Sequence, residues 1–288
     1  MDLLTLNSNS WEKISEISAA GTAKNYWSVG DCKAVELKGT MGTLELDNTL
    51  WLYILGFDHN AEKEGYGITF GGFKTDSGST GINVCLIDSK YNSSSTDGTK
   101  YFNMQHWGYS NHGGWARCDA RYDILGSTNV APSGYGAAVT TSRVGYDATE
   151  TCATNPVSGT LMAALPADLR AVMKGVTKYA DAVGNSSNVA ANVKGFVDYL
   201  PLLAEFEVQG TRTYANQYEQ NYQKQYDYYK NGNSKVMYRH SATSSTAWWR
   251  LRSPGYNNSN DFCNVYTDGS ANFSYARAAG ALAPGFVV

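Results

Sequence analysis

The C-terminal stretch of the chain, residues 248–288, reads WWRLRSPGYNNSNDFCNVYTDGSANFSYARAAGALAPGFVV. Aromatic residues, Asn, Ser and Gly dominate it, and its apolar residues stand in short groups. Tyr and Phe offer large contact areas with few rotatable bonds, while Asn and Ser offer adaptable hydrogen bonds, which is why antibody loops use the same residues. The composition therefore favours a ligand-binding surface over a solvated loop without function.

Five groups of residues in this stretch resemble the fixed framework of the variable proteins of diversity-generating retroelements from phages and gut bacteria. They are Trp248-Trp249, Leu251–Pro254, Phe262-Cys263, Thr267–Ala271 and Ala283–Phe286. Upstream, YWSVGD at 26–31, YILGFDHN at 53–60, LMAALPADLRAVMK at 161–174 and LLAEFEVQGTRTYANQYEQNYQ at 202–223 look like the same group. The resemblance thus covers nearly the whole chain.

The resemblance implies a single C-type-lectin-like domain over residues 1–288, similar to the formylglycine-generating-enzyme branch of that fold. Such a domain is α+β and loop-rich, with a few short helices. In it, a strand rich in Trp and Arg opens the last sheet and a terminal strand containing Gly-Phe closes it. The corresponding pieces here are 248–253 and 282–287, and 248–288 is the variable ligand-binding segment.

Between the framework groups lie the residues that we expect to bind ligand. Their side chains should be exposed and contiguous, because random substitution of inward-pointing residues would destroy the core in most copies. The set comprises Gly255, Tyr256, Asn257, Asn258, Asn260, Asp261, Asn264, Tyr266, Asn272, Phe273, Tyr275, Arg277, Ala278, Ala279 and Gly280. Among the framework residues, Trp248, Trp249, Phe262 and Phe286 should be buried, since large aromatic side chains dominate core energetics.

The amino-acid usage of the stretch agrees with this mechanism of diversification. In such retroelements the adenines of a template are miscopied, and an AAC codon changed at its two adenines never encodes Lys, Glu, Gln, Met or Trp. Residues 251–288 contain none of these five types, whereas residues 1–250 contain 43 of them. At that frequency about six or seven would be expected in the stretch from composition alone.

The resemblance implies a hypervariable receptor-binding protein that catalyses no reaction and needs no cofactor or metal. Its partner would be a protein or glycan receptor on a bacterial cell surface, and its location a phage tail, as part of the virion, or the bacterial surface. Homo-oligomerisation or attachment to a larger virion or surface protein is compatible with that role. An invariant carbohydrate-binding lectin is the alternative, because aromatic and Asn side chains suit sugars equally well.

An oxidase of the formylglycine-generating type is a less favoured alternative. That chemistry resembles a copper–thiolate site with two neighbouring cysteines, and only Cys263 lies in the C-terminal region. The chain contains no GxSxG, no HExxH and no phosphate-binding glycine loop. Asp58-His59-Asn60 is the one arrangement that could orient an imidazole, and we interpret its histidine as a loop or packing residue.

Composition excludes several other classes. The formal net charge is -3 and no basic stripe is present, which disfavours nucleic acid as a partner. No apolar run reaches the 18 residues of a membrane-spanning helix, and the N-terminus lacks the basic flank and apolar run of a signal peptide. The five cysteines include no CxxC pair and are expected to be free, buried thiols.

Local patterns predict several individual elements. Ser10 should cap a short helix that begins at Trp11, and residues 50–57 should form a buried strand. The clearest helix is predicted over 216–231, with Asn216 as its cap. Tyr214, Tyr218, Tyr222 and Tyr226 recur every four residues and are expected to form one stripe along its side. Residues 127–159 are expected to form a long surface excursion.

Overall fold

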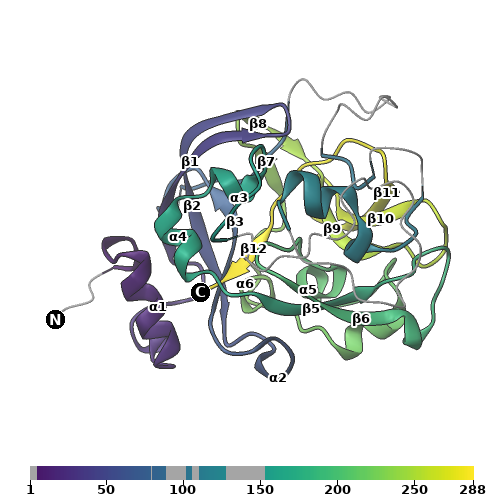
Figure 1. Cartoon of the computed structure of the whole chain (residues 1–288), viewed down its shortest axis with the longest axis horizontal. Coiled ribbons are helices and arrows are strands. Elements are labelled where there is room, and N and C mark those ends of the chain that lie inside the picture. Colours follow the sequence, from purple (N-terminus) through teal and green to yellow (C-terminus); the bar gives the residue numbers. More distant parts are fainter. Residues whose placement is uncertain (1–4, 79, 89–101, 106–109, 128–152) are drawn as a thin grey trace.

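The computed structural model describes residues 5–78, 80–88, 102–105, 110–127 and 153–288. These residues form an α+β structure in which strands dominate and the helices are short (Figure 1). This confirms the α+β, loop-rich class expected from the sequence. Most of the predicted surface excursion at 127–159 lies outside the described residues, as do His106 and Cys152.

The largest sheet has seven strands, in the order β1-β2-β3-β4-β7-β8, with β12 paired to β3. Their bounds are β1 (Cys32–Met41), β2 (Leu44–Phe57), β3 (Ile68–Lys74), β4 (Asn83–Cys85), β7 (Met237–Arg239), β8 (Ala242–Ala247) and β12 (Gly285–Val287). All neighbours are antiparallel except β4 and β7. The predicted strand at 50–57 is confirmed as the C-terminal half of β2, which is buried along most of that length.

The segment after residue 248 forms a second sheet, and its last strand, β12, belongs to the largest sheet. The second sheet has the order β11-β10-β9, with β9 at Trp249–Pro254, β10 at Asp261–Val265 and β11 at Ala271–Tyr275. The closing strand β12 pairs instead with β3, where Phe286 lies opposite Phe70. Both strands implied by the resemblance therefore exist, but they belong to different sheets. A third, two-stranded sheet pairs β5 (Val176–Asp181) with β6 (Val193–Asp198).

The helices are short segments around these sheets. They are α1 (Trp11–Ala19), α2 (Ala61–Glu64), α3 (Leu161–Ala164), α4 (Ala167–Val172), α5 (Glu205–Gln209) and α6 (Asp227–Lys230), with 3-10 turns at Leu6–Ser8, Ala23–Asn25, Trp115–Arg117, Ala190–Asn192 and Gln217–Asn221 and a π-helical turn at Ala120–Ile124. Ser10 caps α1 by accepting a hydrogen bond from the Lys13 amide, as predicted. Within the described residues, no helix has the length and apolar character needed to cross a membrane.

The prediction of a continuous helix over 216–231 is wrong. Asn216 does cap a helical turn, but that turn is a 3-10 helix that ends at Asn221, and helix resumes only in α6. The physical reason is that polar side chains of this segment form hydrogen bonds with β5 and β9 in the interior of the protein. Glu219 accepts hydrogen bonds from Ser253 and from the Asp181 amide, and Gln223 donates to the Tyr179 carbonyl.

The tyrosines of this segment consequently do not form one stripe. Tyr214 contacts Phe273, Tyr222 stacks on Tyr179, and Tyr226 is buried against His59. Each ring packs on a different part of the fold, because the chain changes direction between the two short helices. Tertiary packing has overridden the periodic pattern.

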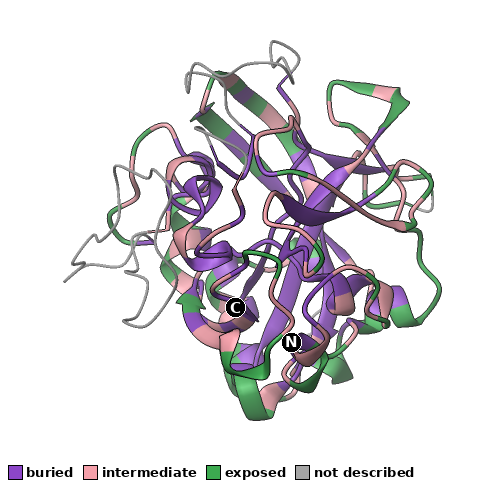
Figure 2. Ribbon diagram, turned by 90° about the vertical axis from the view of Figure 1, so that its right-hand side faces the viewer, coloured by how far each residue is buried: buried purple, intermediate pink, exposed green. Residues whose placement is uncertain are grey.

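Two groups of apolar side chains form the interior, which lies along the strands at the centre of the molecule (Figure 2). In the first, Trp11 of α1 packs edge-on against Phe70 and Phe286, with ring centroids 5.3 and 6.2 Å apart, and so joins α1 to β3 and β12. The second group surrounds Trp249 and Leu251 of β9. The four cysteines within the described residues, Cys32, Cys85, Cys118 and Cys263, are buried and free, as expected.

Three of the four predicted framework aromatics are buried. Trp249 and Phe262 are fully covered and Phe286 is 2% exposed. Trp248, however, is only half-buried, so the prediction is wrong for that residue. Because neighbouring residues in an extended chain point to opposite sides, only one indole of the pair enters the core, and the Trp248 ring instead lies 4.7 Å from the Arg250 guanidinium.

The pair Trp248-Trp249 provides an internally controlled test of this assignment. Trp249→Ala should lower the free energy of unfolding by about 3–5 kcal/mol, because it leaves a cavity and frees the Lys235 carbonyl bound by the indole N–H. Trp248→Ala should cost only about 1 kcal/mol, the scale of one partly exposed cation–π contact. Urea denaturation followed by circular dichroism measures both, and equal losses would contradict the assignment.

Candidate ligand-binding surface

The candidate surface is built on the hairpin of β10 and β11 and on the loop that precedes it. The two strands pair from Asp261 opposite Tyr275 to Val265 opposite Ala271. A tight turn joins them, in which the Asp268 carboxylate accepts hydrogen bonds from the amide and hydroxyl groups of Ser270. The loop at 255–260 connects β9 to β10 on the other side.

Eleven of the fifteen predicted binding residues are accessible to solvent. Tyr266 and Tyr275 are 45% and 54% exposed, and Asn257 is also exposed. The half-buried members are Tyr256, Asn258, Asn260, Asn272, Phe273, Arg277, Ala278 and Ala279. These residues come from the loop, the turn, β11 and the segment that follows it.

The predicted exposure is wrong for the other four residues, Gly255, Asp261, Asn264 and Gly280, all of which are buried. Asp261 and Asn264 lie in β10, the central strand of this sheet, in which the residues on both faces are buried. Gly255 forms a backbone bridge with Ala215. Gly280 lies so close to the Trp248 ring that a Cβ atom would come within 2.5 Å of it.

Asn258 shapes the loop itself. Its side-chain oxygen accepts hydrogen bonds from the amides of Asn260 and Asp261, at 2.8 and 2.9 Å, and its amide group donates to the Asp261 carboxylate. Asn side chains commonly stabilise turns in this way. We therefore interpret Asn258 as a residue that holds the loop in shape.

Asn111, which is distant in the sequence, stabilises the same loop through hydrogen bonds to its main chain. Its fully buried amide group donates to the carbonyls of Gly255, Asn258 and Asp261 at 3.3, 3.0 and 2.9 Å. Its side-chain oxygen accepts from the Asn185 amide, which ties the loop to a second part of the chain. Asn111 is not among the residues predicted from the sequence, because no local pattern reveals a partner more than 140 residues away.

Arg250 of β9 stabilises the main chain at the end of β11 and just after it. Its guanidinium donates to the carbonyls of Ser274, Tyr275 and Ala278 at 3.1, 2.7 and 2.6 Å. Both Asn111 and Arg250 thus bind main-chain oxygen atoms, which every amino acid carries. The backbone of the segment can therefore keep its course when the exposed side chains change.

A buried group of charges anchors β9 to the rest of the fold. The Arg252 guanidinium makes two hydrogen bonds of 2.6 Å with the Glu207 carboxylate of α5, and both side chains are fully buried. Lys178 of β5 pairs with Glu64 and lies 3.7 Å from Glu207. Burial alone would raise the pKa of Glu207, but Arg252 and Lys178 outweigh it and lower that pKa to about 2.

His59, Glu64 and Glu207 bring potential metal-ligand atoms within 4.8 Å of one another. The Lys178 ammonium already contacts both carboxylates, however, so that the chain balances their charge itself. Burial and the nearby Lys178 lower the pKa of His59 to about 3, and its neutral ring stacks on Tyr226 at 3.8 Å. This arrangement supports an ionic core in which His59 packs against Tyr226.

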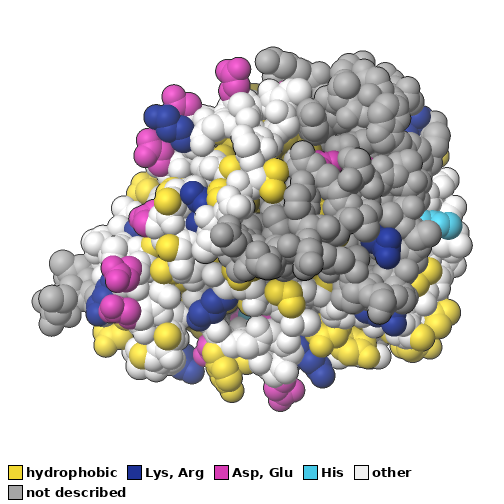
Figure 3. All heavy atoms as spheres, viewed as in Figure 1, with side chains coloured by type: hydrophobic (Ala, Val, Ile, Leu, Met, Phe, Trp, Pro, Cys, Tyr) yellow, Lys and Arg dark blue, Asp and Glu magenta, His cyan; other side chains and the backbone are white. Residues whose placement is uncertain are grey.

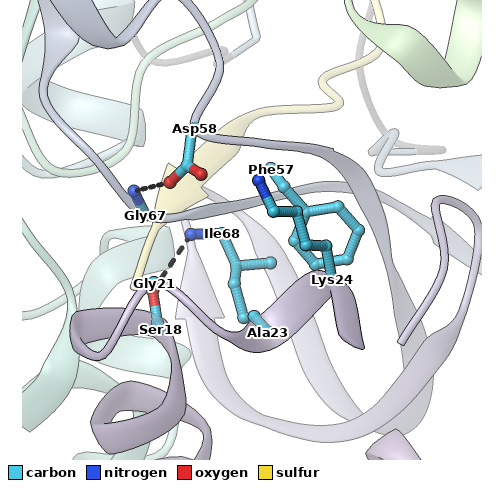
Figure 4. Close-up of a pocket in the computed structure, with 8 residues that line it drawn as sticks. All are labelled: Ser18, Gly21, Ala23, Lys24, Phe57, Asp58, Gly67 and Ile68. Carbon is cyan, nitrogen blue, oxygen red and sulfur yellow. Dashed lines mark hydrogen bonds between the residues drawn. The ribbon is translucent and has the colours of Figure 1, made fainter. Parts of the chain in front are cut away.

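Two cavities lie away from the candidate surface. A small one of about 10 Å³ is lined by Ser18, Gly21, Ala23, Lys24, Phe57, Asp58, Gly67 and Ile68 (Figure 4), and has room for about one water molecule. The other, of about 410 Å³, is lined by Phe57, Asp58, His59, Asn60, Phe206, Lys224, Gln225, Asp227 and Lys230. None of the predicted binding residues lines either cavity. On the face shown in Figure 3, the coloured cationic and anionic side chains are intermixed.

The contribution of Asn111 can be measured directly. Asn111→Ala should lower the free energy of unfolding by about 1–3 kcal/mol, because it leaves buried carbonyls without donors. Amide hydrogen exchange should accelerate at 255–261 and stay unchanged in the β1–β2 hairpin. Asn257→Ala, an exposed substitution in the same loop, is the control and should have neither effect. Unchanged exchange in the Asn111 variant would show that the loop does not depend on this residue.

Comparison with known proteins gives one match. A family model described as a domain of unknown function, DUF6273, matches residues 83–288. No curated protein and no solved structure matches the chain. The matched region includes Asn111, the arginines of β9 and the whole candidate surface, and it covers well over half of the sequence. The chain therefore belongs to the DUF6273 family.

Proposed function

We propose that this protein is a hypervariable ligand-binding protein with a C-type-lectin-like fold, diversified by a retroelement and without catalytic activity. The observation that carries the proposal is the way in which its C-terminal segment is held. Asn111 and Arg250 donate hydrogen bonds to six main-chain carbonyl groups of that segment, which are present whatever side chains it carries. Such an attachment tolerates changes of side chain at the surface.

Two further observations support the proposal. The amino-acid types that adenine miscopying cannot produce are absent from 251–288. In addition, the accessible residues are mostly Tyr, Asn and Phe, a set that suits protein recognition. After removal of the buried residues and the loop-shaping Asn258, the proposed binding residues are Tyr256, Asn257, Asn260, Tyr266, Asn272, Phe273, Tyr275, Arg277, Ala278 and Ala279.

The partner under this proposal is a receptor on a bacterial cell surface, and the protein is carried on a phage tail or on the surface of a bacterium. The principal alternative is a lectin of invariant sequence, for which the exposed tyrosines and asparagines would bind sugar. The two functions differ in one respect that can be observed directly. Only a diversified protein changes its sequence at the surface within a single lineage.

Deep sequencing of the 3′ end of the gene in one lineage tests the proposal. We expect substitutions to be concentrated at the codons of exposed positions such as 257, 266 and 275. A near-identical template copy of the 3′ end should lie beside a reverse-transcriptase gene, and the substitutions should fall where that template has adenines. The codons of buried Asp261 and Asn264 should change far less often in functional copies. An invariant 3′ end without a template copy would refute diversification and favour the lectin.

The surface can also be tested by removing its tyrosines. Replacing Tyr256, Tyr266 and Tyr275 together by Ala should shift the unfolding midpoint by no more than about 4 °C, because Tyr266 and Tyr275 are exposed and Tyr256 is only half-buried. The same variant should lose binding to the bacterial strains that the parent protein labels in flow cytometry. A large loss of stability would mean that these tyrosines belong to the core, and retained binding would place the binding site elsewhere.

A further inference from the structure

The segment Arg212–Ala215, which precedes the second sheet in the sequence, lies directly against the proposed binding surface. Ala215 forms a backbone bridge with Gly255, and the Tyr256 amide donates to the Tyr214 carbonyl at 2.8 Å. The segment therefore continues the surface beyond residues 248–288. None of its residues belongs to the predicted binding set.

The position of this segment is fixed from inside the protein. The fully buried Glu205 carboxylate accepts hydrogen bonds from the amides of Thr213, Tyr214 and Ala215, at 3.1, 3.0 and 2.8 Å. A carboxylate that accepts several amide hydrogen bonds is a strong anchor. The segment is thus held without any contribution from a variable side chain.

Two side chains of the segment reach the variable residues. The Arg212 guanidinium lies 4.0 Å from the centroid of the Tyr256 ring, and the Tyr214 ring meets Phe273 edge-on at 4.8 Å. Arg212 donates through Nε to the Ala215 carbonyl, while its Nη2 is shielded from solvent and has no hydrogen-bond partner. A fixed cation with an unused donor therefore lies at the edge of the surface, covered by the replaceable side chain of Tyr256.

We propose that Arg212 is a constant specificity-determining residue of the surface, which favours acidic protein partners whatever the variable sequence. The inference rests on the proposed function and adds the chemistry of the partner. A guanidinium with a free donor recognises carboxylates through charge-assisted, directional hydrogen bonds. Tyr214 supplies a fixed aromatic contact beside it, as is common at protein–protein interfaces.

The charges around Arg212 leave this preference in place. Glu205 is fully buried and its carboxylate is occupied by main-chain amides. In the variable segment, Asp261 is buried and Asp268 is bound to Ser270 in the hairpin turn. Neither acidic residue forms an ion pair with Arg212 among the described residues, so a carboxylate from a partner meets no competing contact there.

Two displayed libraries test the inference. Codons 256, 257, 260, 266, 272 and 275 are randomised at their first two bases with C at the third, in the parent and in Arg212→Gln, so that the side chain covering Arg212 also varies. Each library is selected against one strongly acidic and one strongly basic protein. An Arg239→Gln library, in which an exposed arginine of β7 is replaced, controls for the same change in net charge.

We expect Arg212→Gln to reduce the number of distinct binders to the acidic target about ten-fold, the scale of one lost charge-assisted hydrogen bond. Binders to the basic target should not decrease, and Arg239→Gln should match the parent. Equal yields in the parent and Arg212→Gln would overturn the inference, as would an equal loss on both targets, which would indicate a structural role. An equal loss in Arg239→Gln would assign the effect to net charge. A failure to obtain binders from any library, including the parent, would instead refute the proposed function.

Discussion

The bidentate ion pair between Arg252 and Glu207 is the interaction on which the proposed binding surface depends. It joins β9, the first strand of the second sheet, to α5, and both side chains are fully buried. Loss of one partner would leave an uncompensated charge in the interior, which typically costs 3–5 kcal/mol. Lys178 and Glu64 extend the pair to β5 and α2, so four elements distant in sequence meet at one balanced group of charges.

This anchor makes β9 a rigid base for the segment that we propose to be variable. Two residues before Arg252, the guanidinium of Arg250 binds the carbonyls that follow β11. On the other side, Asn111 binds the carbonyls of the loop before β10. Rigid elements beneath the surface and main-chain contacts at its edges separate stability from recognition, since random changes above them leave the anchoring contacts intact.

The positions of the strands explain why the predicted exposure was correct for only some of the proposed binding residues. Its exposed members lie at the turn, in the loop and on the edge strand, whereas Asp261 and Asn264 lie in the central strand of the sheet. The sequence pattern treats all polar residues between framework groups alike, because their placement depends on the order of strands in space. A polar residue in the middle strand is covered by its neighbours and finds partners there, as Asn264 does with Ser274.

The sequence by itself determined the features that depend on neighbouring residues. The apolar run at 50–57 makes a strand, Ser10 caps a helix, and Trp249 and Phe262 enter the core because large apolar side chains leave water wherever they can be covered. Only the tertiary structure decided that the helix expected at 216–231 is broken, that Trp248 stays half-exposed, and that Asn111 and Arg212 border the surface. Each of these outcomes depends on a hydrogen bond, ring contact or backbone bridge between separate segments. Such contacts form only when folding brings those segments together, and no local pattern of residues specifies them.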